Sequence, residues 1–321
     1  MSIRFIRLLL LCLLAGSQAV WADTASGTAQ AQALEQLQQA PARGLFYEVR
    51  KGGQKAYLYG TIHLGRPDFY PLDLATIRAL AQSSELVVEL DATQADKVRA
   101  ALLQNGMLPR GQTLDAMLPP ELGKRLQAQL DAQGIPEAAV QPVKPWMAGL
   151  ALLAGLIQKM GYDPELGTDF YLIQVARQFG MPIAELESAG EQFSLFDRLP
   201  HQDQLVYLEE SLSLLENHQA QSDLEALIAA WLASDAPALH QLTLKSLRDS
   251  PRSAAWMERV LIRGRNSGMA SKVDQMIRSG HTPFVAVGAL HLTGETGLPA
   301  LLEAKGYRVT NLYPKNVKET P

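Results

Sequence analysis

The chain has 321 residues, of which 47% are hydrophobic and 19% are charged. This composition is typical of a globular protein with a sizeable core and excludes a disordered or membrane-integral chain. The formal net charge of −4 argues against a nucleic-acid partner, because nucleic-acid-binding proteins carry basic surfaces.

Residues 1–22 have the features of a secretory signal. Arg4 and Arg7 precede an apolar run at residues 8–14, and the small-residue cleavage site Val20-Trp21-Ala22 stands before Asp23. The run is shorter than the roughly 20 residues of a membrane-spanning helix. We therefore expect cleavage near Ala22, no stable membrane span, and a periplasmic or secreted protein.

Cleavage would leave 27 basic residues against 33 acidic ones, a net charge of −6. It would also remove Cys12, the single cysteine of the chain. The mature protein would then have no disulfide and no thiolate ligand, so any metal ion must be held by histidines and carboxylates.

The mature chain is interpreted as a single α/β domain over residues 44–314, with a flexible lead-in at 23–43 and a tail at 315–321. Runs of β-prone residues at 45–50 and 55–59 flank Gly52-Gly53, which predicts a hairpin. The second run leads directly into Gly60-Thr61-Ile62-His63. A helix at about 72–82 and a strand at 85–90 are expected next.

The segment from about 93 to 279 is predicted to be helical by its hydrophobic period, except for one short strand at 181–186. A strand at 283–287 then leads into Gly288-Ala289-Leu290-His291, and a helix at about 298–305 and a strand at 307–312 complete the chain. The predicted fold is therefore α/β, with a mixed central sheet built from two β-turn-α-β repeats and a large helical insertion between them.

The pattern Gly-x-x-His-Leu occurs twice, at Gly60–Leu64 and at Gly288–Leu292. The glycine, histidine and leucine content predicts roughly 0.07 occurrences by chance. Each copy follows a predicted strand, and ligands of open α/β sheets bind beyond the carboxyl ends of the strands. We expect His63 and His291 to converge on one site; the alternative is two histidines that only fill tight turns.

Glu89 is predicted to lie in the middle of a valine-rich strand, where an unpaired carboxylate would cost several kcal/mol. Its position beside the strand that leads to His63 favours metal ligation or general-base catalysis. The alternative is a salt bridge with an arginine.

The apolar stretch from Trp146 to Ile157 is too short to cross a bilayer and is expected to be a buried core helix. The alternative is a helix that contacts an apolar substrate above the site.

The chain resembles the TraB/GumN family, also called the Tiki-like metalloprotease family. The motifs that carry the resemblance are Tyr57–His63, Glu85–Asp91, Gly167-Thr168-Asp169, Leu186-Glu187 with Glu191-Gln192, Arg265-Asn266, and the closing run Phe284–Tyr307. The resemblance spans nearly the whole mature chain. It implies a fold related to the erythromycin-esterase enzymes and, in animal Tiki members, metal-dependent cleavage of the amino terminus of a signalling protein.

The resemblance implies that His63 and His291 are metal ligands and that Glu89 is a ligand or a catalytic base. It also implies that Glu187 and Arg265 are catalytic residues that support the site. Arg265 has an alternative interpretation, as part of the solvated face of a long helix. Asp169 is equally well explained as the start of a helix.

These observations predict an exported, metal-dependent hydrolase that resembles a peptidase and cleaves an amide or ester with metal-activated water. A peptide or protein substrate is expected. The absence of sulfur ligands leaves Mn, Co and Zn as candidate metals. The alternative function is a non-catalytic exported protein that sequesters a peptide signal or assists envelope assembly. No pattern in the sequence indicates an oligomeric state.

Overall fold

The computed structural model describes residues 35–249 and 251–314. The predicted signal at 1–22, most of the lead-in and the tail at 315–321 lie outside these residues. Six strands form one sheet: β1 (Leu45–Lys51), β2 (Gln54–Thr61), β3 (Glu85–Val88), β4 (Ile183–Glu185), β5 (Pro283–Gly288) and β6 (Arg308–Asn311).

The α-helices are α3 (Leu74–Ala81), α4 (Ala95–Gly106), α5 (Pro120–Gln133), α6 (Glu137–Val140), α7 (Pro145–Lys159), α8 (Thr168–Gln178), α9 (Ala189–Asp197), α10 (His201–Glu216), α11 (Gln219–Leu232), α12 (Ala236–Asp249), α13 (Pro251–Trp256), α14 (Gly264–Arg278) and α15 (Leu298–Ala304). A π-helical segment, η4 (Met257–Arg263), joins α13 to α14. Short 3-10 turns are η1 (Pro67–Phe69), η2 (Asp115–Met117), η3 (Pro164–Leu166) and η5 (Ala289–Leu292).

The strand order is β4-β3-β5-β2-β1-β6. The neighbouring strands from β4 to β2 are parallel, whereas β1 is antiparallel to both β2 and β6. The predicted hairpin is confirmed, with Gly52 and Gly53 at φ values of 53° and 84° that glycine adopts without strain. The predicted mixed α/β sheet with a helical insertion is also present.

The two β-turn-α-β units interlock in the sheet. The second strand of the first unit, β3, lies beyond β5, and the second strand of the other unit, β6, lies beyond β2 and β1. The two first strands, β2 and β5, are therefore neighbours, with Gly60 opposite Val287 and Thr61 opposite Gly288. This register brings the two Gly-x-x-His turns out of the sheet side by side.

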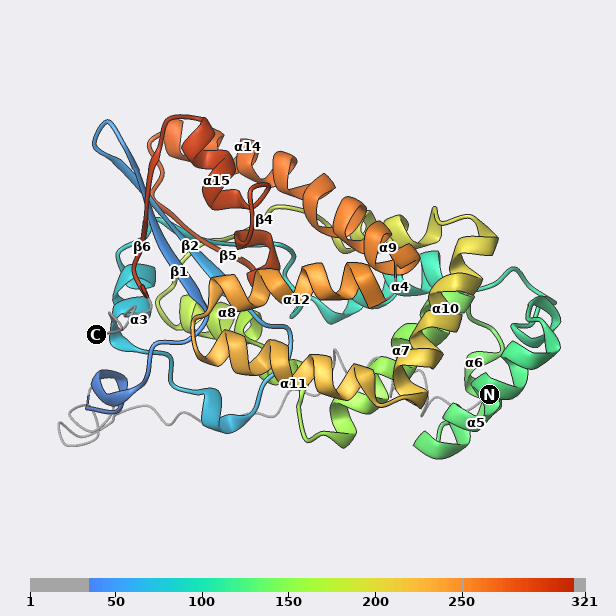
Figure 1. Cartoon of the computed structure of the whole chain (residues 1–321). Helices are drawn as coiled ribbons and strands as arrows, with labels where there is room; N and C mark the ends of the chain where they lie inside the picture. Colours follow the sequence, from blue (N-terminus) through green and yellow to red (C-terminus); the bar gives the residue numbers. More distant parts are fainter. Residues whose placement is uncertain (1–34, 250, 315–321) are drawn as a thin grey trace.

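Helices cover both faces of the sheet, and a helical lobe extends from one end (Figure 1). One face packs Tyr59, Phe284 and Leu86 against α3 and α8. The other face packs Leu58 and Val285 against α11, α12, α14 and α15. Strands buried on both faces explain the continuous apolar run in β5.

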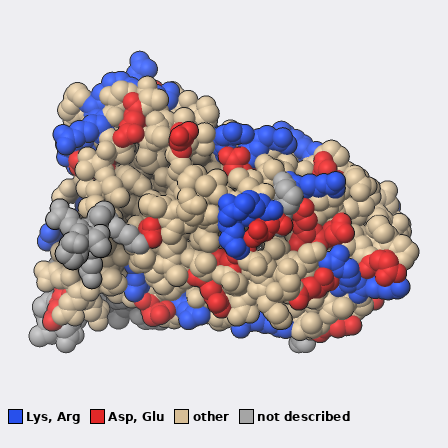
Figure 2. All heavy atoms as spheres, viewed as in Figure 1, with Lys and Arg blue, Asp and Glu red and all other residues tan. Residues whose placement is uncertain are grey.

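The helical lobe has its own core, formed mainly by α5, α7 and α10. In α7 the residues Trp146, Ala148 and Leu152 are fully buried, which agrees with the core interpretation of this apolar stretch. No helix among the described residues is long and apolar enough to span a membrane. On the face shown in Figure 2, basic and acidic side chains are interspersed.

One boundary differs from the sequence prediction. Glu89 is not in the middle of a strand, because β3 ends at Val88, where its pairing with β4 and β5 stops. Glu89 therefore stands just past the carboxyl end of the strand, at the same edge of the sheet as the two Gly-x-x-His turns.

Candidate active site

The two Gly-x-x-His turns pack directly against each other, and their glycines allow this approach. A Cβ atom at Gly60 would lie 3.0 Å from the Cα of Ala289. A Cβ atom at Gly288 would lie 3.2 Å from Glu89 Oε1, 3.3 Å from His63 Nε2 and 3.6 Å from His291 Cδ2. The carboxylate and both imidazoles therefore surround a single backbone position. The predicted convergence of these three residues is present in the structure.

His63 is held by a carboxylate from α8. Its Nδ1 atom lies 2.6 Å from Oδ2 of Asp169, and Thr168 N–H donates to the carbonyl of Ile62, which ties the start of α8 to the turn. The Asp169 carboxylate raises the pKa of His63 to about 9. Asp169 thus lies in the first turn of α8, which Gly167 precedes without a side-chain cap, and its carboxylate contacts His63.

His291 is the buried member of the pair, with only 2% of its surface exposed. Its Nδ1 lies 2.5 Å from Oδ1 of Asn266, and the Asn266 amide nitrogen donates to the carbonyl of Thr296 at 2.8 Å. This second bond sets the amide orientation, so Nδ1 of His291 carries the proton, and Nε2 accepts a hydrogen bond from Nη1 of Arg265 at 3.3 Å. Burial lowers the pKa of His291 and favours this neutral tautomer.

Glu89 accepts hydrogen bonds on both carboxylate oxygens. The backbone N–H of Gly288 donates to Oε1 at 2.6 Å, and Nη2 of Arg265 donates to Oε2 at 2.5 Å. His291 Nε2 lies 3.6 Å from Oε1. Burial alone would raise the pKa of Glu89, but His291, Arg265 and His63 together lower it to about 2. The carboxylate is therefore ionised at neutral pH.

Arg265 connects the two predicted carboxylates. Its Nε and Nη2 atoms donate to Oε2 of Glu187 at 2.8 and 2.5 Å, and its side chain is only 12% exposed. The arginine follows η4, where the wider π-helical turn precedes α14. Arg265 is not part of a solvated helix face. Its guanidinium points into the site and donates hydrogen bonds to two carboxylates.

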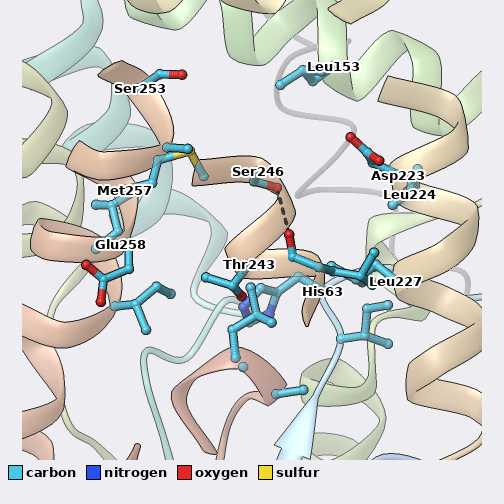
Figure 3. Close-up of a pocket in the computed structure, with 18 of the residues that line it drawn as sticks. His63, Leu153, Asp223, Leu224, Leu227, Thr243, Ser246, Ser253, Met257 and Glu258 are labelled. Atoms are coloured by element: carbon cyan, nitrogen blue, oxygen red, sulfur yellow. Dashed lines mark hydrogen bonds between the residues drawn. The ribbon is translucent and has the colours of Figure 1, made fainter. Parts of the chain in front are cut away.

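His63, Glu89, Arg265 and His291 form the floor of a cavity of about 660 Å³. His63 is 64% exposed, and it lies at the bottom of the cavity in Figure 3, below Leu227 and Thr243. The site is therefore concave, polar at its floor and reachable by a small molecule or a segment of a larger one.

Comparison with known proteins places this site in a family. The model of the TraB/PrgY/gumN family matches residues 45–311. The chain belongs to the TraB/PrgY/gumN family. It is 30% identical to the uncharacterized protein YbaP of Shigella flexneri and to that of Escherichia coli over 256 residues, which cover 78% of this chain and 89% of either relative.

The chain is also similar to proteins named metalloproteases. The chain is 27% identical to metalloprotease TIKI1 of Danio rerio over 307 residues, which cover 79% of this chain and 60% of that protein. It is 26% identical to metalloprotease TIKI2 of Xenopus tropicalis over 308 residues, covering 79% of this chain and 57% of that protein. No solved structure matches the chain.

The similarity to metalloproteases implies a metal ion, so we asked whether the side chains of this site could hold one. Within residues 35–249 and 251–314, no group of three or more His, Cys, Asp or Glu side chains is arranged to hold a metal ion. Glu89 and Glu187 instead share Arg265 as their positively charged partner. The alternative interpretation of Glu89, a salt bridge with an arginine, thus describes the observed contact.

The chemistry of the donors nevertheless fits a divalent cation. Both imidazoles bind an oxygen acceptor through Nδ1, the usual arrangement of metal-binding histidines in proteins. Nε2 of His291 lies 3.3 Å from Nη1 of Arg265, so a cation there would have to displace this contact. Glu89 adds an ionised carboxylate at the same position. The metal-ligand roles of His63, His291 and Glu89 remain predictions that this donor set supports.

Two side chains of the site had no role in the sequence interpretation. Gln192 donates to Glu187 Oε2 at 3.2 Å and approaches Glu89 Oε2 at 3.4 Å, and Asn266 orients His291. Both belong to motifs of the TraB/PrgY/gumN resemblance, directly beside Glu191 and Arg265. Their position next to these charged motif residues was the signal that could have identified them.

Proposed function

We propose that this protein is an exported, metal-dependent hydrolase, resembling a peptidase, that cleaves an amide or ester bond. The observation that carries the proposal is the convergence of His63, His291 and Glu89 on Gly288, with Nδ1 of each histidine held by an acceptor. The similarity to proteins named metalloproteases supports it. A peptide or protein substrate is proposed on the same basis.

His63, His291 and Glu89 are the residues that would hold the cation, with Mn, Co or Zn as candidates. The chemistry supplied by a bound divalent cation is polarisation of a carbonyl and a source of hydroxide near neutral pH. His63 has to lose its Nε2 proton before that atom can be a ligand, while Nδ1 keeps its proton toward Asp169. Because Asp169 raises the pKa of His63 to about 9, cation binding would release the Nε2 proton below about pH 9.

The remaining residues have separate roles. The low pKa of Glu89 suits a ligand better than a proton carrier. We therefore assign proton transfer from the attacking water to the leaving group to Glu187. Arg265 keeps its charge at any working pH, because Glu89 and Glu187 raise its pKa against the effect of burial. It stabilises the negative charge that develops on the carbonyl oxygen.

The test combines elemental analysis of the purified protein with a peptide-library cleavage assay, with and without added Mn²⁺, Co²⁺ or Zn²⁺. The expected result is cleavage that chelator abolishes and that His63→Ala and His291→Ala each reduce by a factor of at least about 100. His218→Ala is the control, because His218 is exposed and does not line the cavity. Cleavage that survives chelator and both site substitutions would disprove the metal mechanism.

A second function, binding without turnover, is favoured by one observation. Arg265 forms an ion pair with both Glu89 and Glu187, so each carboxylate has a positively charged partner without a metal ion. An exported protein of this kind would sequester a peptide signal or assist envelope assembly. Its ligand binding should survive chelator and both histidine substitutions, whereas hydrolysis should not.

Export is part of the proposal and rests on the pattern of residues 1–22. Fractionation of cells that express the full chain should place it in the periplasm or the medium. Mass spectrometry of that fraction should find Asp23 as the first residue. Full-length protein in the cytoplasm would contradict export and leave the hydrolase assignment to its own test.

A further inference from the structure

The cavity above the candidate site has apolar walls that the proposed chemistry does not explain. Its floor is formed by His63, Glu89, Arg265 and His291, and its walls by α7, α10, α11, α12 and η4. The wall residues that matter most here are Leu153, Leu156, Leu224, Leu227, Leu242 and Leu261. Figure 3 shows Leu227 and Leu224 on one side of the cavity, Met257 on the other, and Leu153 opposite His63.

The acidic side chains in the wall are paired with basic neighbours. Lys245 lies 2.6 Å from Asp223 and 3.1 Å from Asp249, and Arg263 lies 3.8 Å from Glu258. Each of these acids therefore already has a basic partner, and the three acids and two bases together leave one net negative charge on the wall. An uncharged, apolar ligand can enter this cavity at a small free-energy cost of desolvation.

The walls also offer little to a peptide backbone. The wall residues of α7, α10, α11 and α12 lie within helices, whose N–H and C=O groups are already bonded along the helix. Peptides that bind in an extended form pair with an exposed strand edge, and the wall is helical. A peptide main chain inside this cavity would leave its amides unpaired, which a hydrocarbon chain does not.

We propose that the cavity accommodates the hydrocarbon chain of a long-chain acyl group, whose carbonyl lies at the polar floor. The volume of about 660 Å³ is that of a site for one small ligand. The inference rests on the proposed hydrolase function and specifies its substrate as a peptide or protein that carries this acyl group on an amine or a hydroxyl. Water adds to the acyl carbon, the C–N or C–O bond breaks, the hydroxyl stays on the fatty acid, and the proton goes to the amine or alcohol.

The test is binding of butanoate, octanoate and dodecanoate to the full-length protein, measured by calorimetry in chelator and below the concentration at which micelles form. Each methylene that enters the cavity contributes about 0.8 kcal/mol, so Kd should fall by up to roughly fourfold per methylene. A blocked peptide of leucine and serine, matched in length to dodecanoate, is the competing ligand. It should bind more weakly than dodecanoate.

Two substitutions fill the cavity, and each has a control on the same helix. Leu227→Trp on α11 and Leu242→Trp on α12 should weaken dodecanoate binding at least 10-fold. Ala226→Trp and Gln241→Trp, at exposed positions of the same helices, should leave the Kd within twofold. Thermal melts confirm that all four variants fold, and a variant that does not fold is replaced by Leu224→Phe.

Three outcomes would overturn the inference. The first is no binding of any fatty acid, and the second is an affinity that does not depend on chain length. The third is a peptide that binds more tightly than dodecanoate and whose binding Leu227→Trp abolishes. The metal-dependent hydrolase can fail without this result. Chain-length-dependent binding to a protein that cleaves nothing would retain the acyl cavity and reject the enzyme. Metal-dependent cleavage of peptides without fatty-acid binding would retain the enzyme and reject the acyl cavity.

Discussion

Gly288 lies at the centre of the candidate site, where there is little space for a side chain. Its N–H orients Glu89, and the space where a side chain would begin is bordered by Glu89 and His63. The two histidines around it are set differently. His63 is charged by its contact with Asp169, and His291 is buried and neutral. The two imidazoles of this site therefore differ in protonation, one charged and one neutral.

Gly288→Ala should therefore reduce hydrolysis much more than it reduces stability. The added methyl group would stand 3.2 Å from Glu89 Oε1 and 3.3 Å from His63 Nε2, and displacing such groups by a fraction of an ångström to 1 Å can cost about 100-fold in rate. Measured kcat/KM and urea unfolding test this expectation. Gly268→Ala is the control, because no atom lies within 4 Å of a Cβ at that position. Equal activity of both variants would contradict the central position of Gly288.

The His63–Asp169 contact predicts a pH dependence of stability. The folded pKa of about 9 lies above the ordinary value of 6.5. The contribution to stability is therefore complete below about pH 6.5 and is lost as the pH rises through about 9. The free energy of unfolding of the metal-free protein should decrease over this interval. In Asp169→Asn the decrease should be smaller, and an unchanged pH profile would contradict the ion pair.

At the scale of elements, the turn that carries His63 is supported by a helix from the insertion. The Trp231 indole on α11 donates to the carbonyl of Gly60 at 2.8 Å, at the end of β2. The helix thus satisfies a backbone group of the site strand as well as packing against it. In α7, by contrast, the buried indole N–H of Trp146 has no hydrogen-bond partner among the described residues.

These two tryptophans make a matched pair of substitutions. Both are fully buried, so Trp231→Phe and Trp146→Phe lose similar packing. Only Trp231→Phe also leaves a buried carbonyl without its donor, which costs about 1–3 kcal/mol. Urea unfolding should show Trp231→Phe to be less stable than Trp146→Phe by about this difference. Equal loss in the two variants would show that the bond to Gly60 contributes nothing.

At the scale of the whole molecule, the site depends on the pairing of β2 with β5. These strands are adjacent in the sheet although the helical insertion separates them in the chain. Val285 and Val287 of β5 are fully buried, whereas β6 is an edge strand paired on one side. The centre of the sheet, which carries both histidine turns, should be the last part to open.

Native-state hydrogen exchange tests this order of opening. The amides of β5 should exchange only through global unfolding, with an opening free energy equal to that from urea unfolding. The amides of β6 should exchange with a smaller free energy. Faster exchange in β5 than in β6 would mean that the site can open locally without unfolding the sheet.

Short-range patterns were enough to predict most elements from the sequence. The Gly52-Gly53 hairpin, the strand before Gly288 and the helix after it follow from turn chemistry and hydrophobic periodicity, which act over a few residues. The repeated Gly-x-x-His-Leu pattern also indicated which strand ends carry the site. The exact end of β3 was missed, because it is set by where its neighbours β4 and β5 stop pairing.

Only the tertiary structure decided what surrounds the histidines. Arg265 contacts Glu89 and Glu187, and Asn266 and Asp169 orient the two imidazoles. These contacts join residues up to 176 positions apart, the separation of Glu89 and Arg265. The apolar cavity likewise appears only when helices from different parts of the insertion meet above the sheet. Such contacts depend on packing and charge across the whole fold, so no pattern of a few neighbouring residues predicts them.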